Sequence, residues 1–597
     1  MKRLLSKVIA LAMSLTAAAS VFSGCEKGGD KVNKYVYTGP NDVQYMTFVI
    51  TNVYWENTES YLRKMKELHP DNKAGAKRMY AFGTPGPMLI TQSVEQIRDQ
   101  VNGSFAYAKQ YDIPVFFQLD DTTNYTTSFG DGAEIKYYEH PEMCEWTQFP
   151  DEGETYGGES AYGRLPKWYF NWGTEMAVEA VPNQASPQFR AFLKSQLEEG
   201  FIKPLIENLR ELQKEGREYL FAGCNIGWET QIPDYSSDSI LGSGVQMAES
   251  WERTQYGYGA LHSLGYDQKR LIKEADEAFR VGGPATSNNA YICEMREYCE
   301  KNDVPLDFIS THHYPTDVVL GYGVENSRNF FKEFSELDKT DKAAVNALAN
   351  EFVTFRKNIW KDVNRGVLTE MAKRARKEAG NLPLFYTEWS SLAGLPSDGS
   401  FGASFIAKTI PDNMGLADAY SYWTFSDILE EDGFPSAAFH GGYGLLTLQN
   451  VAKAPYRAFQ LLHRLGEERY QKKFAWETLD IYAFRDRSNN TVQLLCVNHQ
   501  SLLHDISVRT AEIELEGEKF AGCSPEIVRI DDEHANAIKE WERIGCPEYV
   551  TQAQVSALQS ASELKNEFLV AEREGEKLKL HFDVPPMGVA LVTVYLK

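Results

Sequence analysis

Eight short apolar runs recur between residues 45 and 427, and longer amphipathic stretches separate them. Most of the runs begin with apolar residues and end with polar ones. This pattern is typical of strands that are buried on both faces, as in a parallel sheet covered by helices. The eight runs span residues 45–50, 78–83, 113–121, 219–230, 282–286, 308–314, 382–389 and 419–427.

The stretches between these runs predict helices. Residues 93–111, 186–215 and 343–378 are rich in Leu, Lys, Glu, Arg and Gln, and their apolar residues recur at spacings of three and four. Eight alternations of strand and helix predict an α/β protein with a (β/α)8 barrel over residues 45–466. An open doubly wound sheet is the alternative, and the lack of a glycine-rich phosphate loop after the first run disfavours it.

Three other segments depart from the alternation. Residues 121–219 contain many aromatic residues, between about 125 and 175, that either wall a sugar site or form a satellite core. Residues 321–377 are longer than one connection requires and predict an extra helix. From residue 467 to 597, short alternating runs with polar turns predict a second, mostly antiparallel β domain.

The N-terminus has the layout of a bacterial lipoprotein signal. Lys2, Arg3 and Lys7 precede an apolar segment, and the sequence Val-Phe-Ser-Gly-Cys ends at Cys25. We therefore expect residues 1–24 to be a signal peptide, Cys25 to be lipidated, and residues 25–44 to be a polar tether. This places the protein in the bacterial cell envelope, attached to the membrane only through its lipid. An ordinary signal peptide that is cleaved nearby is the alternative.

Composition excludes several classes of partner. Asp and Glu outnumber Lys and Arg by 84 to 61, so the formal net charge is -23 and the surface repels nucleic-acid phosphates. No CxxC pair occurs, and the adjacent His312 and His313 should face opposite ways on a strand, so no metal site is predicted. No cofactor is expected either.

Two glutamates follow predicted barrel strands, Glu229 after the fourth run and Glu388 after the seventh. Residues at the carboxyl ends of barrel strands face the substrate. Paired carboxylates are what glycosidic cleavage needs, and a separation of about 5–5.5 Å gives retention of configuration. A structural role for either glutamate stays open at this point, and Asp120, after the third run, can touch substrate or cap a turn.

Three stretches of the chain resemble the β-xylosidase and α-L-iduronidase family, glycoside hydrolase family 39. These motifs occur in the family order, and they cover roughly residues 280–597. The resemblance implies a (β/α)8 barrel followed by a C-terminal antiparallel β-sandwich. The stretches are residues 280–315 (RVGGPATSNNAYICEMREYCEKNDVPLDFISTHHYP), the segments YTEW, SYWTFSD and FHGGYGL between residues 386 and 445, and residues 529–547 (RIDDEHANAIKEWERIGCP) with 586–589.

The resemblance also implies roles for individual residues. Glu388 in the TEW motif matches the nucleophile, and Glu229 occupies the place of the acid/base. His312 and Tyr314 match residues of the sixth strand that contact the sugar. The remaining matches are an aromatic wall beside the sugar, Trp423, and carboxylates that hold its hydroxyl groups, Glu430 and Glu431.

The sequence departs from the family pattern in its N-terminal half. The family reads Trp-Asn-Glu-Pro-Asn at the acid/base, whereas this chain reads Gly-Trp-Glu-Thr-Gln over residues 227–231. Trp228 replaces the Asn that bonds the sugar 2-hydroxyl, and an indole can only donate a hydrogen bond. The family histidine near the second strand is also absent from residues 77–81. We therefore expect a different sugar pocket, to which Trp228 and Asp120 contribute.

Together these patterns predict a retaining exo-glycoside hydrolase that acts on oligosaccharides or polysaccharides, with β-xylosides as the default substrate. α-L-Iduronides, β-galactosides and β-glucosides are alternative substrates. A non-catalytic glycan-binding lipoprotein is the alternative from another class. The sequence does not indicate an oligomeric state.

Overall fold

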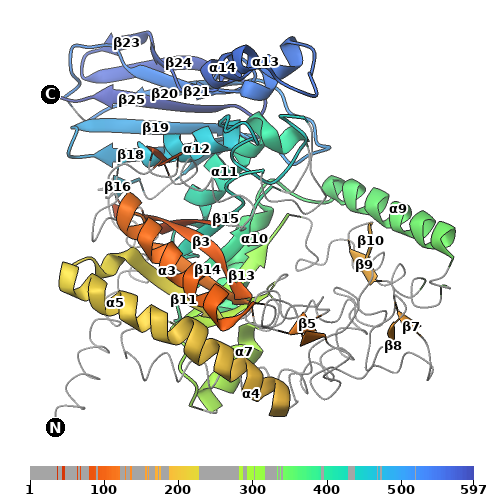
Figure 1. Ribbon diagram of the computed structural model, residues 1–597. Helices are drawn as coiled ribbons and strands as arrows, with labels where there is room; N and C mark the ends of the chain where they lie inside the picture. Colours follow the sequence, from red (N-terminus) through yellow and green to blue (C-terminus); the bar gives the residue numbers. More distant parts are fainter. Residues whose placement is uncertain are drawn as a thin grey trace.

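The computed structural model describes long continuous segments at residues 92–120, 187–226, 303–315, 341–391, 395–427, 437–466, 473–517 and 519–597. Elsewhere it describes shorter pieces, which include the remaining strands named below. Two layers of structure result (Figure 1): a barrel with helices around it, and a C-terminal β domain that packs on one side of the barrel.

Eight parallel strands close into a barrel, and they coincide with the eight apolar runs of the sequence. The ring runs in the order β11-β12-β13-β14-β15-β2-β3-β4, so the strands follow one another around it in chain order. This closed barrel excludes the open doubly wound sheet. The strands are β2 (Val43–Thr47), β3 (Met79–Met88), β4 (Val115–Asp120), β11 (Phe221–Ile226), β12 (Val281–Thr286), β13 (Phe308–His313), β14 (Leu384–Trp389) and β15 (Ala419–Trp423).

Burial on both faces explains why the runs do not alternate between apolar and polar residues. Every residue of β13, β14 and β15 is buried. Phe308 and Phe385 stack between neighbouring strands with ring centroids 4.5 Å apart. Stacked aromatic pairs stabilise a fold by more than the apolar area they bury would predict. The polar residues near the ends of β13 and β14, His312, His313 and Glu388, are buried as well.

The helices begin and end where the sequence supplies caps. Ser93 and Gln96 form a capping box at the start of α3, and Asp112 ends this helix in a left-handed conformation. The predicted helix over 186–215 is one run of three pieces, α4, η6 and α5. The extra helix predicted in 321–377 is α9, which extends away from the barrel (Figure 1).

The bounds of the helical elements outside the C-terminal domain are as follows. They are α3 (Val94–Tyr111), α4 (Pro187–Gln196), η6 (Leu197–Ile202), α5 (Lys203–Glu215), η7 (Glu218–Leu220), α7 (Ile292–Lys301), α9 (Lys342–Asn358), η11 (Ile359–Lys361), α10 (Val367–Ala379), η12 (Leu395–Asp398), α11 (Ser400–Asn413) and α12 (Ala454–His463). Among the described residues, no helix is long and apolar enough to span a bilayer.

The segment between β4 and α4 contains three small antiparallel hairpins. They are β5 (Ser128–Phe129) with β6 (Ile135–Lys136), β7 (Thr155–Tyr156) with β8 (Glu159–Ser160), and β9 (Tyr169–Asn171) with β10 (Thr174–Met176). The side chains of the aromatic insertion lie outside the described residues, so its two interpretations stay predictions.

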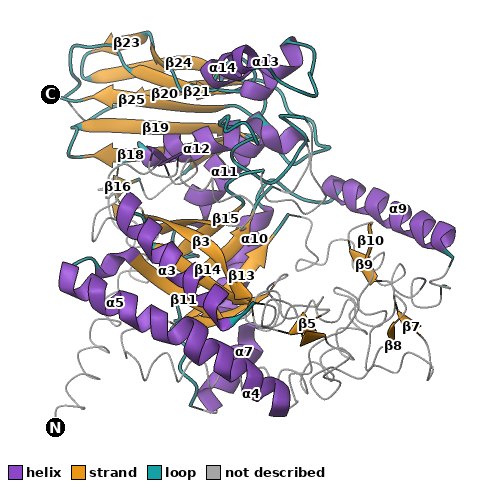
Figure 2. Ribbon diagram, viewed as in Figure 1, coloured by secondary structure: helices purple, strands orange, loops and turns teal. Residues whose placement is uncertain are grey.

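The C-terminal domain contains two antiparallel sheets, drawn in orange beside two helices in Figure 2. Apolar residues from β19 and β25 of one sheet and β24 of the other share one buried cluster. The elements are β16 (Glu468–Arg469), β17 (Phe474–Trp476), β18 (Leu479–Asp486), β19 (Thr491–Asn498), β20 (Arg509–Leu515), β21 (Glu526–Ile530), α13 (Ala537–Arg543), α14 (Gln552–Ala561), β22 (Asn566–Phe568), β23 (Ala571–Glu574), β24 (Lys577–Val584) and β25 (Val589–Tyr595).

One strand near the N-terminus joins this domain. β1 (Val36–Tyr37) pairs antiparallel with β16, so Val36 lies opposite Arg469. The expected tether, residues 25–44, therefore contains a strand of the C-terminal sheet, and β2 of the barrel begins within it at Val43. A dipeptide strand carries no periodic signal, which is why the sequence reading missed it.

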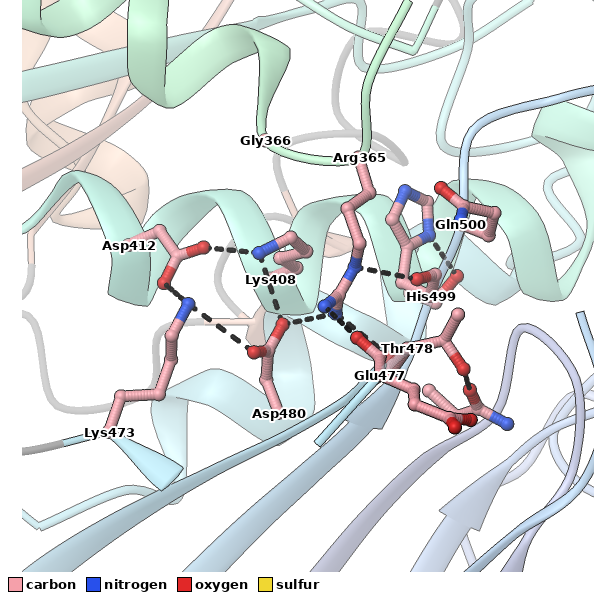
Figure 3. Close-up of polar contacts among 12 residues, drawn as sticks. Arg365, Gly366, Lys408, Asp412, Lys473, Glu477, Thr478, Asp480, His499 and Gln500 are labelled. Atoms are coloured by element: carbon pink, nitrogen blue, oxygen red, sulfur yellow. Dashed lines mark hydrogen bonds and ion pairs between the residues drawn. The ribbon is translucent and has the colours of Figure 1, made fainter. Parts of the chain in front are cut away.

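A buried charged cluster joins the barrel to the C-terminal domain (Figure 3). Lys408 of α11 lies 2.5 Å from Asp412 and 3.1 Å from Asp480 of β18. Arg365 also pairs with Asp480, and it donates hydrogen bonds to the carbonyl groups of Glu477, Thr478 and His499. These contacts satisfy charges that burial would otherwise make costly.

His499 in this junction makes the free energy of unfolding depend on pH under acidic conditions. Burial, followed by the nearby charges of Lys408 and Arg365, holds the pKa of His499 well below its ordinary value. The ring is neutral in the folded protein and gains a proton after unfolding. The stability that His499 contributes is therefore complete above pH 6.5 and is lost as the pH falls below it.

We expect the free energy of unfolding to fall by about 1.4 kcal/mol per pH unit below pH 6.5 on account of His499. Urea titrations of wild-type protein and of His499→Phe between pH 7.5 and 5.5 measure this difference in slope. Phe keeps a ring between Phe401 and Phe405, which flank the imidazole. Equal slopes for the two proteins would contradict the assignment.

Candidate active site

Glu388 lies near the carboxyl end of β14, the seventh strand of the barrel, and its side chain is buried. Its Oε2 atom accepts a hydrogen bond of 3.0 Å from the hydroxyl group of Tyr314. The same oxygen lies 3.4 Å from Nδ1 of His312. Strand pairing sets this geometry, because His312 of β13 lies directly opposite Glu388 in the parallel register. The two contacts define the orientation of this carboxylate relative to Tyr314 and His312.

The two histidines face different neighbours, as strand alternation predicts. His312 and Tyr314 both reach Glu388, whereas the ring of His313 packs on Tyr386 with centroids 4.3 Å apart. Burial, then the proximity of His312, holds the pKa of His313 well below its ordinary value. His313 is therefore a neutral core residue. Among the described residues, no group of three or more His, Cys, Asp and Glu is placed to hold a metal ion.

Trp389 anchors the strand that carries Glu388. Its indole is buried and packs against Phe405, Tyr420 and Tyr422, with ring centroids between 5.3 and 6.1 Å away. The strand register shifts between Tyr386 and Trp389, and the two neighbouring side chains make separate contacts: Trp389 packs in the aromatic core, and Glu388 contacts Tyr314 and His312. The TEW motif thus places a hydrogen-bonded carboxylate next to a buried core indole.

A buried ion group, not predicted from the sequence, lies beyond the end of β15. Nζ of Lys453 is 2.6 Å from Asp398 and 2.7 Å from Asp427, and all three side chains are fully buried. Burial is the largest influence on Asp427, and it raises the pKa of this carboxyl to about 6 although Lys453 opposes the shift. Both carboxylates and the ammonium group contact the backbone of residues 441–444.

The other predicted site residues fall into two groups. Trp423 is the last residue of β15, it is buried, and it pairs in register with Thr47 of β2. Asp120 is the last residue of β4, and its side chain lies outside the described residues. So do Trp228, Glu229, Glu430, Glu431 and Cys25 in their entirety.

The barrel nevertheless fixes the strand that leads to Glu229. β11 is the fourth strand of the ring and ends at Ile226, three residues before Glu229. β14 is the seventh strand, and all strands of the barrel are parallel. Glu388 therefore lies at the carboxyl end of a barrel strand, where barrel enzymes place their catalytic groups. Glu229 lies outside the described residues, so its place at the end of β11 stays a prediction. The separation of the two glutamates stays a prediction as well.

The fold and the setting of Glu388 define a barrel protein with a buried, hydrogen-bonded carboxylate at the carboxyl ends of its strands. The profile of glycosyl hydrolases family 39 matches residues 263–577, which is more than half of the chain. The chain belongs to this family.

Two curated relatives support the assignment. A beta-xylosidase of Caldicellulosiruptor saccharolyticus is 37% identical over 330 residues, which are 54% of this chain and 61% of that protein. A beta-xylosidase of Geobacillus stearothermophilus is 25% identical over 298 residues, or 49% of this chain and 53% of the relative. The match thus spans little more than half the length of these relatives.

Solved structures share the fold over nearly the whole chain. A GH39 beta-xylosidase from Caulobacter crescentus superposes with a TM-score of 0.57 at 17% identity, covering 95% of this chain and 98% of the other. A bacterial orthologue of human α-L-iduronidase superposes with a TM-score of 0.53 at 11% identity, covering 95% and 82%. At these identities the likeness shows a barrel with a C-terminal domain.

Proposed function

We propose that this protein is a retaining exo-glycoside hydrolase of β-xylosidase type. The observation that carries the proposal is the setting of Glu388, whose Oε2 atom is contacted by both Tyr314 and His312 at the carboxyl end of a barrel strand. Two polar partners on one oxygen leave the orientation of the carboxylate defined. Preorganisation of this kind is what an attacking nucleophile requires.

In the proposed mechanism Glu388 attacks the anomeric carbon while Glu229 gives its proton to the leaving oxygen. The glycosidic bond breaks, and a glycosyl ester forms on Glu388. Glu229, now a carboxylate, takes a proton from water, and the water oxygen attacks the same carbon. The ester bond breaks, Glu388 is restored, and two inversions give net retention.

Membership of the family and the names of the curated relatives support a β-xyloside as substrate. An α-L-iduronide, a β-galactoside or a β-glucoside is the alternative. Trp228, in place of the Asn that the family uses for the sugar 2-hydroxyl, supports a pocket that differs from the family pattern in this part. The substrate itself is an oligosaccharide or polysaccharide with an accessible non-reducing end.

The test is a panel of aryl glycosides followed by proton NMR of the first product. Hydrolysis of an aryl β-xyloside with the β-anomer of xylose appearing first is the expected result, because each of the two displacements inverts the anomeric carbon. Appearance of the α-anomer first would exclude a covalent intermediate on Glu388. Binding of the panel without any turnover would favour the non-catalytic glycan-binding lipoprotein.

We further propose that the C-terminal domain is a β-sandwich and that Cys25 carries a lipid anchor in the bacterial cell envelope. The cluster of apolar residues shared by the two antiparallel sheets supports the sandwich. The basic start, the apolar segment and the small residues before Cys25 support the anchor.

A further inference from the structure

Residues 441–444 are held by buried charges on both sides of Tyr443. Oδ2 of Asp398 accepts a 2.8 Å hydrogen bond from the backbone N–H of Gly441. Oδ1 of Asp427 accepts one of 2.9 Å from the backbone N–H of Gly444. Lys453 lies between the two carboxylates and also donates to the carbonyl oxygen of Gly442 at 3.4 Å. We call Asp398, Asp427 and Lys453 the ion clamp.

Two glycines of this loop cannot be replaced without strain, Gly441 because of its backbone conformation and Gly444 because it packs closely against Asp427. Gly441 has a φ of 83°, in the left-handed region that favours glycine. A Cβ atom on Gly444 would lie 2.2 Å from the backbone nitrogen of Asp427, a distance that no side chain tolerates. The backbone of Tyr443 is fixed as well, since its carbonyl oxygen accepts a hydrogen bond of 3.1 Å from Thr424.

Side-chain contacts connect residues 441–444 with the predicted nucleophile, Glu388. The ring of Tyr443 meets the ring of Tyr314 edge to face, with centroids 6.3 Å apart and planes at 69°. Tyr314 in turn donates the 3.0 Å hydrogen bond to Glu388. The chain of contacts therefore runs from the ion clamp through Tyr443 and Tyr314 to the carboxylate.

We propose that the ion clamp and Tyr443 are positioning residues, which hold the Tyr314 phenol in line with Oε2 of Glu388. Tyr314 is only partly buried, and the Tyr443 ring is its aromatic contact on the side of the clamped loop. An error of 1 Å in the position of a reacting group can cost about 100-fold in rate, so a rigid loop at this place affects turnover. This inference rests on the proposed function.

The composition of the clamp fits a positioning role better than a stabilising one. Two carboxylates and one ammonium group are completely buried, and their desolvation offsets much of their mutual attraction. An apolar cluster of the same volume would stabilise the barrel equally well. Charged groups can hold the two N–H groups and the carbonyl of the loop at once, which apolar side chains cannot.

The junction with the C-terminal domain offers a matched control. Lys408 is also a buried lysine between two aspartates, Asp412 and Asp480, but it belongs to the cluster of Figure 3 and contacts no residue of the chain of contacts above. Lys453→Met and Lys408→Met each remove one buried ammonium group from between two aspartates, although Lys473 and Arg365 still pair with Asp412 and Asp480 in the second variant. The melting temperatures of both variants are therefore measured beside their kinetics. General loss of stability affects both variants, whereas loss of positioning affects only Lys453→Met.

The experiment measures kcat and KM on the activated aryl glycoside that wild-type protein hydrolyses, at a temperature where circular dichroism shows every variant folded. We expect Lys453→Met to lower kcat by about 10- to 100-fold with KM little changed, and Lys408→Met to stay within roughly threefold of wild type. Equal losses in the two variants, or no loss in either, would overturn the inference.

Tyr443→Ala tests the same inference without touching a buried charge, since Tyr443 is only partly buried. We expect kcat to fall about tenfold, and Tyr443→Phe, which keeps the ring edge on Tyr314, to restore most of it. Wild-type kcat in Tyr443→Ala would overturn the positioning role and leave the proposed function intact. A wild-type protein that hydrolyses no glycoside of the panel would overturn both.

Discussion

Replacement of Glu388 by Gln is expected to lower kcat on an aryl β-xyloside by about four orders of magnitude or more, as removal of a covalent nucleophile does in other enzymes. An amide is nearly the same size as a carboxylate and can still accept the hydrogen bond from Tyr314. It cannot form the glycosyl ester. The measurement is steady-state hydrolysis of the substrate that wild-type protein prefers.

Two controls separate lost chemistry from lost folding. The melting temperature of Glu388→Gln should stay close to that of wild type, because only one atom of a buried side chain changes. In Glu388→Ala, azide should enter the vacated space and give a glycosyl azide of inverted configuration. Residual activity within tenfold of wild type, in protein freed of wild-type contamination, would show that another group is the nucleophile.

The second large effect concerns Glu229. Glu229→Ala is expected to slow hydrolysis of glycosides with poor leaving groups by about 10²- to 10⁴-fold, the usual contribution of general acid–base catalysis. Glycosides with activated phenols need little protonation when the bond breaks, so their first step should be much less affected. The measurement is the dependence of kcat/KM on the pKa of the leaving phenol, which should become far steeper than in wild type.

Azide distinguishes a lost acid/base from a damaged pocket. It attacks the glycosyl ester on Glu388 without needing a general base, so it should raise kcat of Glu229→Ala on activated substrates and give an azide of retained configuration. Asp120→Asn, at the end of the neighbouring strand β4, is the matched control and should not respond to azide. A uniform loss on all leaving groups would reassign the acid to another residue.

The barrel could be predicted from the sequence because strands that are buried on both faces leave short apolar runs, most of which have polar residues near their ends. β13 and β14 illustrate this: both are buried throughout, and they end in His312-His313 and Glu388-Trp389. Strand alternation predicted that His312 and Tyr314, which are two residues apart, point the same way, and both contact Glu388. The resemblance to the family then added roles that periodicity cannot supply.

The ion clamp could not be predicted in this way. Asp398 lies in the connection between β14 and α11, whereas Asp427 and Lys453 lie 26 residues apart in the connection between β15 and α12. Pairing between such distant charges leaves no periodic trace in a single sequence. The one available signal was the segment His-Gly-Gly-Tyr-Gly at residues 440–444, whose glycines indicate a close approach of backbone to other atoms. The ion pair between Arg365 and Asp480 at the domain junction could not be predicted either, because the two residues are far apart in the chain.

With the proposed lipid on Cys25, the pairing of β1 with β16 would limit the distance between the folded protein and a bilayer. Only ten residues lie between Cys25 and Val36, where the chain enters the C-terminal sheet. Fully extended, such a segment reaches about 40 Å. If Cys25 is acylated, the edge strand β1 stays within that distance of the lipid, so the protein reaches only glycans that approach the membrane to within this distance plus its own width.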